Sequence, residues 1–129
     1  MSMISDISDY LEDQGIGTVG QDIFDNYLPD TGETPALAVI DTGGMEPDID
    51  LPHKEKTFQV FIRADTYANA DTKLQTVRTA LHQLMNQTLG STYFYFIYAM
   101  QEGGPITISQ DSSGRGLVEM SINFRTRTR

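Results

Sequence analysis

The clearest pattern along the chain is an alternation of apolar and polar residues in two stretches that lie far apart in the sequence. Apolar side chains occupy every second position across 58–64 and again across 118–124. A period of two is typical of a β-strand that buries one face. We therefore expect strands over 57–64 and 118–125, each with one face in the core.

Two other stretches show helical spacing. Apolar residues recur every three or four positions over 3–14, and a longer stripe follows the alternating stretch at 58–64. Asp65 or Thr66 can cap the start of this longer helix, and Gly90 can end it. The sequence predicts two amphipathic helices that lie on a sheet. The longer stripe consists of Tyr67, Ala70, Leu74, Val77, Leu81 and Leu84.

Shorter apolar runs, separated by turns rich in glycine and proline, predict the remaining strands. These runs cover 18–27, 36–40, 93–100 and 106–109. The run at 93–100 is aromatic on both faces, so we expect a central strand or one whose second face is covered by a partner. From about 42 to 56 no periodicity persists, which predicts a long loop. Loops of this length in compact domains are functional or disordered.

The order of these elements indicates the fold class. Tight turns between the last strands permit hairpins but not crossovers. We expect an α+β fold with a mostly antiparallel sheet and two helices packed on it, forming a single domain over 1–129.

Charge is distributed unevenly along the chain. Residues 1–53 hold twelve acids and no lysine or arginine, whereas 54–129 hold nine bases and six acids, and the net charge is -9. Such a balance disfavours nonspecific binding to a nucleic acid backbone. If the asymmetry survives folding, one face of a subunit can attract a different face of its neighbour, head to tail. The alternative is an acidic surface that only aids solubility.

Composition narrows the chemistry further. The chain has no cysteine, so disulfides, zinc–thiolate sites and thiol nucleophiles are excluded. No apolar run reaches the roughly 18 residues of a membrane span, and the first residues lack the pattern of a secretory signal. We expect a soluble protein that does not bind a membrane.

Few residues offer catalytic or metal chemistry. His53 lies in the loop without a second nitrogen ligand nearby, and His82 is expected on the surface of the long helix. A serine hydrolase elbow, Gly-x-Ser-x-Gly, is missing. Loop acids could bind calcium or magnesium, but Pro52 occupies a ligand position of an EF-hand pattern.

A metal-dependent nuclease is a distant alternative. Pro47-Asp48 and Asp71-Thr72-Lys73 resemble the Pro-Asp and Asp-x-Lys pieces of a large nuclease family. That chemistry needs both acids and the lysine to project from adjacent strands at one metal. Because Asp71 and Lys73 fall inside the predicted helix, they should point away from such a site. We expect no catalytic residue, no metal and no cofactor.

The last residues alternate between arginine and threonine. Arg125, Arg127 and Arg129 would share one face of an extended tail that continues the polar side of the last strand. Three like charges repel one another, so they are either a solvated terminus or partners for the acidic surface of a neighbouring subunit. We therefore name two sets of candidate interaction residues. They are the arginines of the tail and the loop acids Glu46, Asp48 and Asp50.

The order of several segments resembles that of the tail terminator, or tail completion, and minor capsid proteins of long-tailed bacteriophages. These segments are Gly17 to Phe24, Leu28-Pro29-Asp30, Val39 to Gly44, Phe58 to Ala64, Gly104-Pro105-Ile106 and Asn123-Phe124. The resemblance implies a virion protein, assembled in the host cytoplasm, that forms a hexameric ring. The ring would cap the tail tube protein, stop polymerisation and dock the tail to the head–tail connector protein, while DNA only passes through its channel. Another neck or head completion protein is the alternative.

Overall fold

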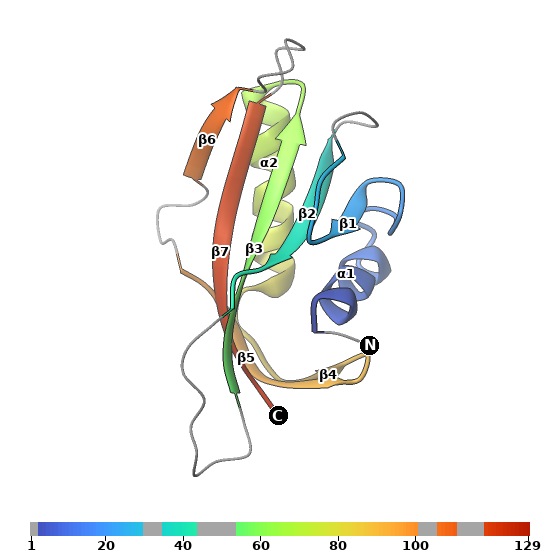
Figure 1. Ribbon diagram of the computed structural model, residues 1–129, viewed down its shortest axis with the longest axis vertical. Coiled ribbons are helices and arrows are strands. Elements are labelled where there is room, and N and C mark those ends of the chain that lie inside the picture. The colour runs from blue at the N-terminus through green and yellow to red at the C-terminus, as the bar shows by residue number, and fades with distance from the viewer. Residues whose placement is uncertain (1–2, 30–34, 44–53, 101–105, 111–117) are drawn as a thin grey trace.

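A computed structural model describes residues 3–29, 35–43, 54–100, 106–110 and 118–129. Two helices and seven strands make up these parts of the chain (Figure 1). The helices are α1 (Met3–Asp13) and α2 (Tyr67–Leu81). The strands are β1 (Ile23–Asp25), β2 (Ala36–Asp41), β3 (Lys54–Ala64), β4 (Leu84–Leu89), β5 (Thr92–Ala99), β6 (Ile106–Gln110) and β7 (Val118–Thr128).

All seven strands join one sheet. Its order is β1-β2-β3-β7-β5-β4, and β6 pairs with the part of β7 that β5 leaves free. The pair β1 and β2 is parallel, and the other pairings between described strands are antiparallel. The predicted α+β class with two helices is confirmed, but the sheet is mixed. Since β1 has three residues, about 10 Å of chain, a short return is enough to make it parallel.

The two alternating stretches form the spine of the sheet. Strands β3 and β7 pair antiparallel over their full length, from Lys54 opposite Thr128 to Ala64 opposite Val118. Their inward apolar side chains are fully buried, as the alternation predicts, except for the partly buried Val118 at the start of β7. Phe58 and Phe124 stack on each other in this core, with ring centroids 5.0 Å apart.

Both helices cover the same face of the sheet. Figure 1 shows α2 behind β3 and β7, and α1 beside β1 and β2. The predicted stripes are buried: Ile4, Ile7 and Leu11 from α1 join the core with Ala70, Leu74, Val77 and Leu81 from α2. Thr66 caps α2 as expected, because its hydroxyl accepts a hydrogen bond from the Asn69 amide over 3.1 Å. In the described parts of the chain, neither helix has the length and hydropathy that a membrane crossing requires.

The long helix ends earlier than its apolar spacing predicts. It stops at Leu81, and Gln83 adopts a positive φ of 68° that turns the chain back. Leu84, predicted on the helix, instead begins β4, a strand absent from the sequence expectation. Gly90 is the turn between β4 and β5 and not a helix end.

Three further expectations need correction. The strand predicted over 18–27 shrinks to β1, because Thr18 accepts amide hydrogen bonds in a turn that Gly20 closes with a φ of 91°. The loop predicted over 42–56 overlaps β3, which begins at Lys54, and its residues 44–53 lie outside the described residues. The last three strands do not form successive hairpins, because β5 and β6 both pair with β7.

A buried acid connects α1 to the far end of the sheet. The Asp6 carboxylate is 1% exposed and accepts hydrogen bonds from the hydroxyls of Ser91 and Thr92 at the start of β5. The adjoining Gly90 lies so close to this carboxylate that a Cβ atom there would collide with it. The β4–β5 hairpin therefore closes against α1, as Figure 1 shows.

Candidate assembly surface

The three C-terminal arginines belong to β7 and its end and share the face of the sheet opposite the helices. Between them, Thr126 and Thr128 point inward and are buried, with exposures of 0% and 3%. The Thr126 hydroxyl donates a 2.6 Å hydrogen bond to the carbonyl oxygen of Phe96. The expected alternation is present, but the segment is a paired strand, with β3 on one side and β5 on the other.

One acid of the same chain contacts two of these arginines. Glu55 on β3 accepts hydrogen bonds from the guanidinium groups of Arg125 and Arg127, one on each carboxylate oxygen. The bond from Arg125 and then that from Arg127 lower the pKa of Glu55, and the same contact raises the pKa of Arg125. Two cations share one anion here, so the cluster keeps an excess positive charge.

The arginines also retain unused donors. The Nε atoms of Arg125 and Arg127 are buried and have no hydrogen-bond partner among the described residues. Higher on the same face, Arg63 and Glu119 form an ion pair at 3.3 Å, and Arg63 also donates to the carbonyl of Pro29 over 2.6 Å. At the lower end of β7, by contrast, two arginines share the single acid Glu55.

Aromatic rings of β5 pack against the guanidinium groups of Arg127 and Arg129. The guanidinium of Arg127 lies 5.7 Å from the Phe96 ring centroid, and that of Arg129 lies 5.1 Å from the Tyr93 ring. Arg129 also donates hydrogen bonds of 3.3 and 3.1 Å to the Tyr95 hydroxyl. Cation–π contacts of this kind hold a guanidinium flat and in place.

The aromatic character of both faces of β5 follows from an irregularity in its pairing with β7. The register shifts between Phe94 and Phe96, so Phe94 and Ile97 both point into the core. A bulge of this type turns the remaining rings outward. The strand is central, as expected, because it lies between β4 and β7. The bulge leaves much of its aromatic surface on the outer face.

We call this surface the arginine–aromatic face. It comprises Arg125, Arg127, Arg129, Tyr93, Tyr95, Phe96, Tyr98 and Glu55.

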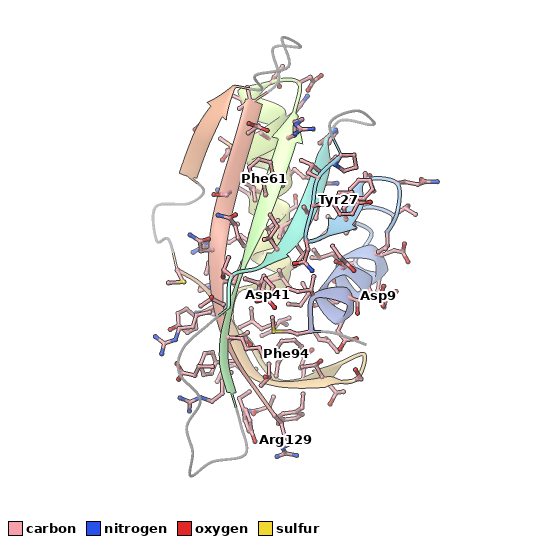
Figure 2. All side chains as sticks on the ribbon, viewed as in Figure 1. Asp9, Tyr27, Asp41, Phe61, Phe94 and Arg129 are labelled. Carbon is pink, nitrogen blue, oxygen red and sulfur yellow. The ribbon has the colours of Figure 1, made fainter. Side chains whose placement is uncertain are left out.

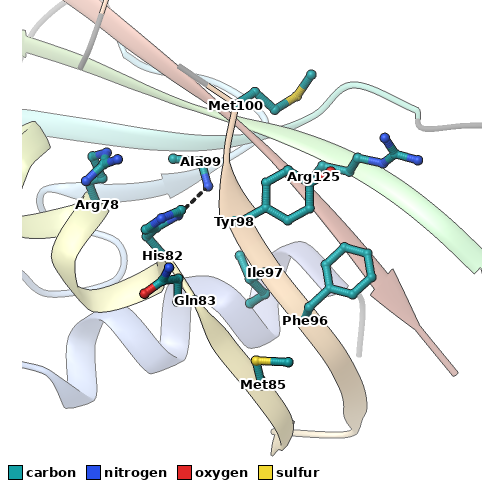
Figure 3. A pocket seen from close by; sticks show the side chains of 10 residues that line it. All are labelled: Arg78, His82, Gln83, Met85, Phe96, Ile97, Tyr98, Ala99, Met100 and Arg125. Carbon is teal, nitrogen blue, oxygen red and sulfur yellow. Dashed lines mark hydrogen bonds between the residues drawn. The ribbon is translucent and has the colours of Figure 1, made fainter. Parts of the chain in front are cut away.

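An apolar groove of about 670 Å³ continues this face past the end of α2. Figure 3 shows Met85, Phe96, Tyr98 and Met100 along it, with Arg125 at one side. Met85 and Met100 are 62% and 50% exposed, which is unusual for side chains of this hydropathy. Methionine adapts to different partners because it is unbranched and polarizable. The groove is therefore suited to protein contacts.

His82 borders the groove and has a structural contact. It is the C-cap residue of α2, not a helix-surface residue as expected. Its Nδ1 accepts a 2.9 Å hydrogen bond from the Ala99 amide, drawn in Figure 3. The ring thus ties the helix end to β5.

The nuclease residues do not come together in the described structure. Lys73 lies on α2 and its amino group donates to the carbonyl oxygen of Ile16. Asp48 lies outside the described residues, together with Glu46, Asp50 and His53. Within the described ranges, no group of three or more histidine or acidic residues could hold a metal ion. The loop acids therefore stay predictions.

Sequence reasoning did not single out Glu55, and it described the tyrosines of 93–100 only as part of a central strand or of one whose second face a partner covers. Their alternation with buried neighbours was visible, but their position opposite the arginines depends on a pairing between residues about seventy positions apart. The only available signal was an acid among bases at the start of a predicted strand.

This chain is similar to known proteins in sequence and in fold. Residues 10–128 match the family described as bacteriophage tail terminator protein, from the last turn of α1 to the last residue of β7. Among solved structures, a chain from "Virion of native gene transfer agent (GTA) particle" is 13% identical with a TM-score of 0.65, covering 98% of this chain and 94% of that chain. At this identity the likeness shows the fold alone. No curated protein matches the sequence.

Proposed function

Because the chain belongs to the bacteriophage tail terminator protein family, we propose that it forms a ring, of six copies, at the head-proximal end of the phage tail tube. The ring stops polymerisation of the tube protein and joins the finished tail to the head–tail connector. It acts in the virion, at the neck of the tail, after assembly in the host cytoplasm. The observation that carries this proposal is the family match over nearly every helix and strand.

The distribution of charge supports assembly through surfaces of opposite sign. All nine bases lie in residues 54–129, and three of them gather on the arginine–aromatic face. The acids of the N-terminal half have no base in that half to balance them. In a ring, acids that face the channel would let DNA pass without binding it, because like charges repel the phosphate backbone.

A structural role without catalysis follows from the family. The loop acids Glu46, Asp48 and Asp50 and the arginines at 125, 127 and 129 are proposed as contact residues. They need no metal and no cofactor for this role. Incubation of the protein with DNA and magnesium or manganese checks the nuclease alternative, and cleavage that is lost in Asp48→Ala would refute a purely structural role.

Mixing the purified protein with growing tail tubes tests the proposed function. We expect the protein to bind one end of each tube in electron micrographs and to stop further growth. A truncated tube protein that cannot polymerise is a suitable control, since binding should require the assembled end. If the protein binds only to heads, it is instead a head completion or connector component.

A further inference from the structure

We infer that the arginine–aromatic face of one copy binds the C-terminal end of α1 in a second copy, which rests on the proposed ring. We define this partner surface, the acidic helix end, by Asp9, Glu12 and Asp13. It names which two surfaces meet when copies associate. The two surfaces are opposite in charge, and they lie too far apart to meet within one copy.

The cationic side has more positive charge than its own chain neutralises. The adjoining ends of β3 and β7, residues 54–56 and 125–129, contain five bases and one acid, Glu55. Arg125 and Arg127 remain 35% and 38% exposed at their side chains, and each keeps an Nε–H donor without a described partner. Carboxylates from outside would relieve this excess at the exposed part of each guanidinium group, since the Nε atoms themselves are buried.

The acidic helix end has the opposite imbalance. Asp9, Glu12 and Asp13 are all exposed, and the last turn of α1 contains no basic residue. The C-terminal end of a helix carries a partial negative charge, so each acid there costs about 0.3–1 kcal/mol. Residues 1–53 contain no lysine or arginine, and the described contact of Lys73 on α2, beside this end, is with the carbonyl oxygen of Ile16 and not with these acids. A cationic surface from another molecule would offset this cost.

The two surfaces cannot meet within one subunit. The arginines point away from the helices, because the residues that alternate with them, Phe124, Thr126 and Thr128, are buried on the side that α1 and α2 cover. Figure 2 labels Asp9 and Arg129, which lie at separate edges of the molecule. A contact between them must therefore join two copies. Since it uses a different surface on each copy, it is heterologous and can close into a ring.

Aromatic rings favour a defined helix end over dispersed charge as the occupant. Arg129 is fixed by Tyr93 and by hydrogen bonds to Tyr95, and Arg127 by Phe96. Guanidinium groups that are already ordered lose little conformational entropy when they bind. Acids one helical turn apart, such as Asp9 and Asp13, project from one side of a helix and match a row of fixed cations.

Charge reversal on both surfaces gives a direct test. The face variant is Arg127→Glu/Arg129→Glu, and the helix variant is Asp9→Lys/Asp13→Lys. Self-association is measured by sedimentation at low salt. We expect each variant alone to associate about tenfold or more weakly than wild type. An equimolar mixture should recover association near the wild-type level, because each reversed face then meets a reversed helix, and each native face a native helix.

Controls separate this contact from general effects of charge and folding. Asp65→Lys/Asp71→Lys makes the same change of charge just before α2 and on its first half, and should leave association unchanged. If the face variant unfolds at a lower temperature than wild type, Arg129→Glu alone replaces it, since Arg129 bonds to Tyr95 whereas Glu55 pairs with Arg125 and Arg127.

Several outcomes would overturn the inference. These are a mixture that does not recover association, a control that weakens it equally, or a wild-type chain that stays monomeric at its highest soluble concentration. Binding of the same variants to tail tubes is scored separately. A chain that still caps tubes without recovery in the mixture would keep the proposed function and refute this contact, whereas a chain that associates but ignores tubes would do the reverse.

Discussion

The hydroxyl of Thr92 on β5 donates a 2.5 Å hydrogen bond to the buried carboxylate of Asp6 on α1. Ser91 adds a second bond of 3.2 Å to the same oxygen. Through this acid the N-terminal helix holds the β4–β5 hairpin, whose outer side carries half of the arginine–aromatic face. The turn between the two strands depends on Gly90, which has a φ of 59°.

Replacing Gly90 by alanine should lower stability strongly. A Cβ at this position would collide with the Asp6 carboxylate, and alanine would also have to adopt the positive φ of Gly90. We therefore expect a loss of about 2 kcal/mol or more in the free energy of unfolding. Gly15→Ala is the matched control, since its φ is 78° but the space around it is open. Urea unfolding should show the larger loss at Gly90, and much of the difference should vanish in an Asp6→Ala background. Equal losses at both glycines would contradict the close approach.

Truncating Phe124 tests the core between β3 and β7. Its ring is fully buried and stacks on Phe58. We expect Phe124→Ala to cost about 3–5 kcal/mol, from lost burial and the cavity left behind. Tyr27→Ala, at a side chain 60% exposed, should cost far less. Thermal unfolding of the two variants is the measurement, and a similar change in both would argue against this core.

The ion pairs of Glu55 should make stability depend on pH. Its pKa in the folded chain lies below the ordinary value of 4.5, mainly because Arg125 and Arg127 donate to it. The stabilisation is therefore complete above the ordinary value and is lost as pH falls through the lowered pKa. Glu55→Gln should cost under about 1 kcal/mol at neutral pH, since the pair lies near the surface. The difference from wild type should shrink in acid, and a difference that grows in acid would contradict the assignment.

Deleting residues 125–129 should damage the fold and not merely remove charge. The sequence pattern alone indicates an exposed tail, yet the deletion would remove the buried Thr126 and Thr128 and their pairing with β3 and β5. We expect a loss of about 3 kcal/mol or more in urea unfolding. Replacing the three arginines by glutamine should cost much less. A truncated chain with wild-type stability would show that this strand end is dispensable.

The two long strands, β3 and β7, and both helices could be predicted because each buries a single side, so its apolar residues recur with the period of a strand or of a helix. β4 could not, because four of its six side chains are exposed and its sequence, Leu-Met-Asn-Gln-Thr-Leu, has no period of two. Its first leucine also continued the apolar spacing of α2, so the pattern favoured a longer helix. The positive φ of Gln83 turns the chain out of the helix before Leu84, and the residue type does not reveal this conformation.

The candidate surface was predictable in part. Alternation alone placed Arg125, Arg127 and Arg129 on one face. The contact of Glu55 with two of them depends on strand register, and the outward rings of β5 depend on a bulge after Phe94. Register and bulges arise from long-range pairing, which local periodicity does not encode.

The last five residues alternate between two structural requirements, one for the inward threonines and another for the outward arginines. Positions 126 and 128 face the interior, where a change of volume or polarity weakens the fold. Positions 125, 127 and 129 face outward and can exchange charge or size with little loss of folding energy. If this strand makes the proposed contact between copies, its outward residues can change one at a time while the sheet beneath them stays the same.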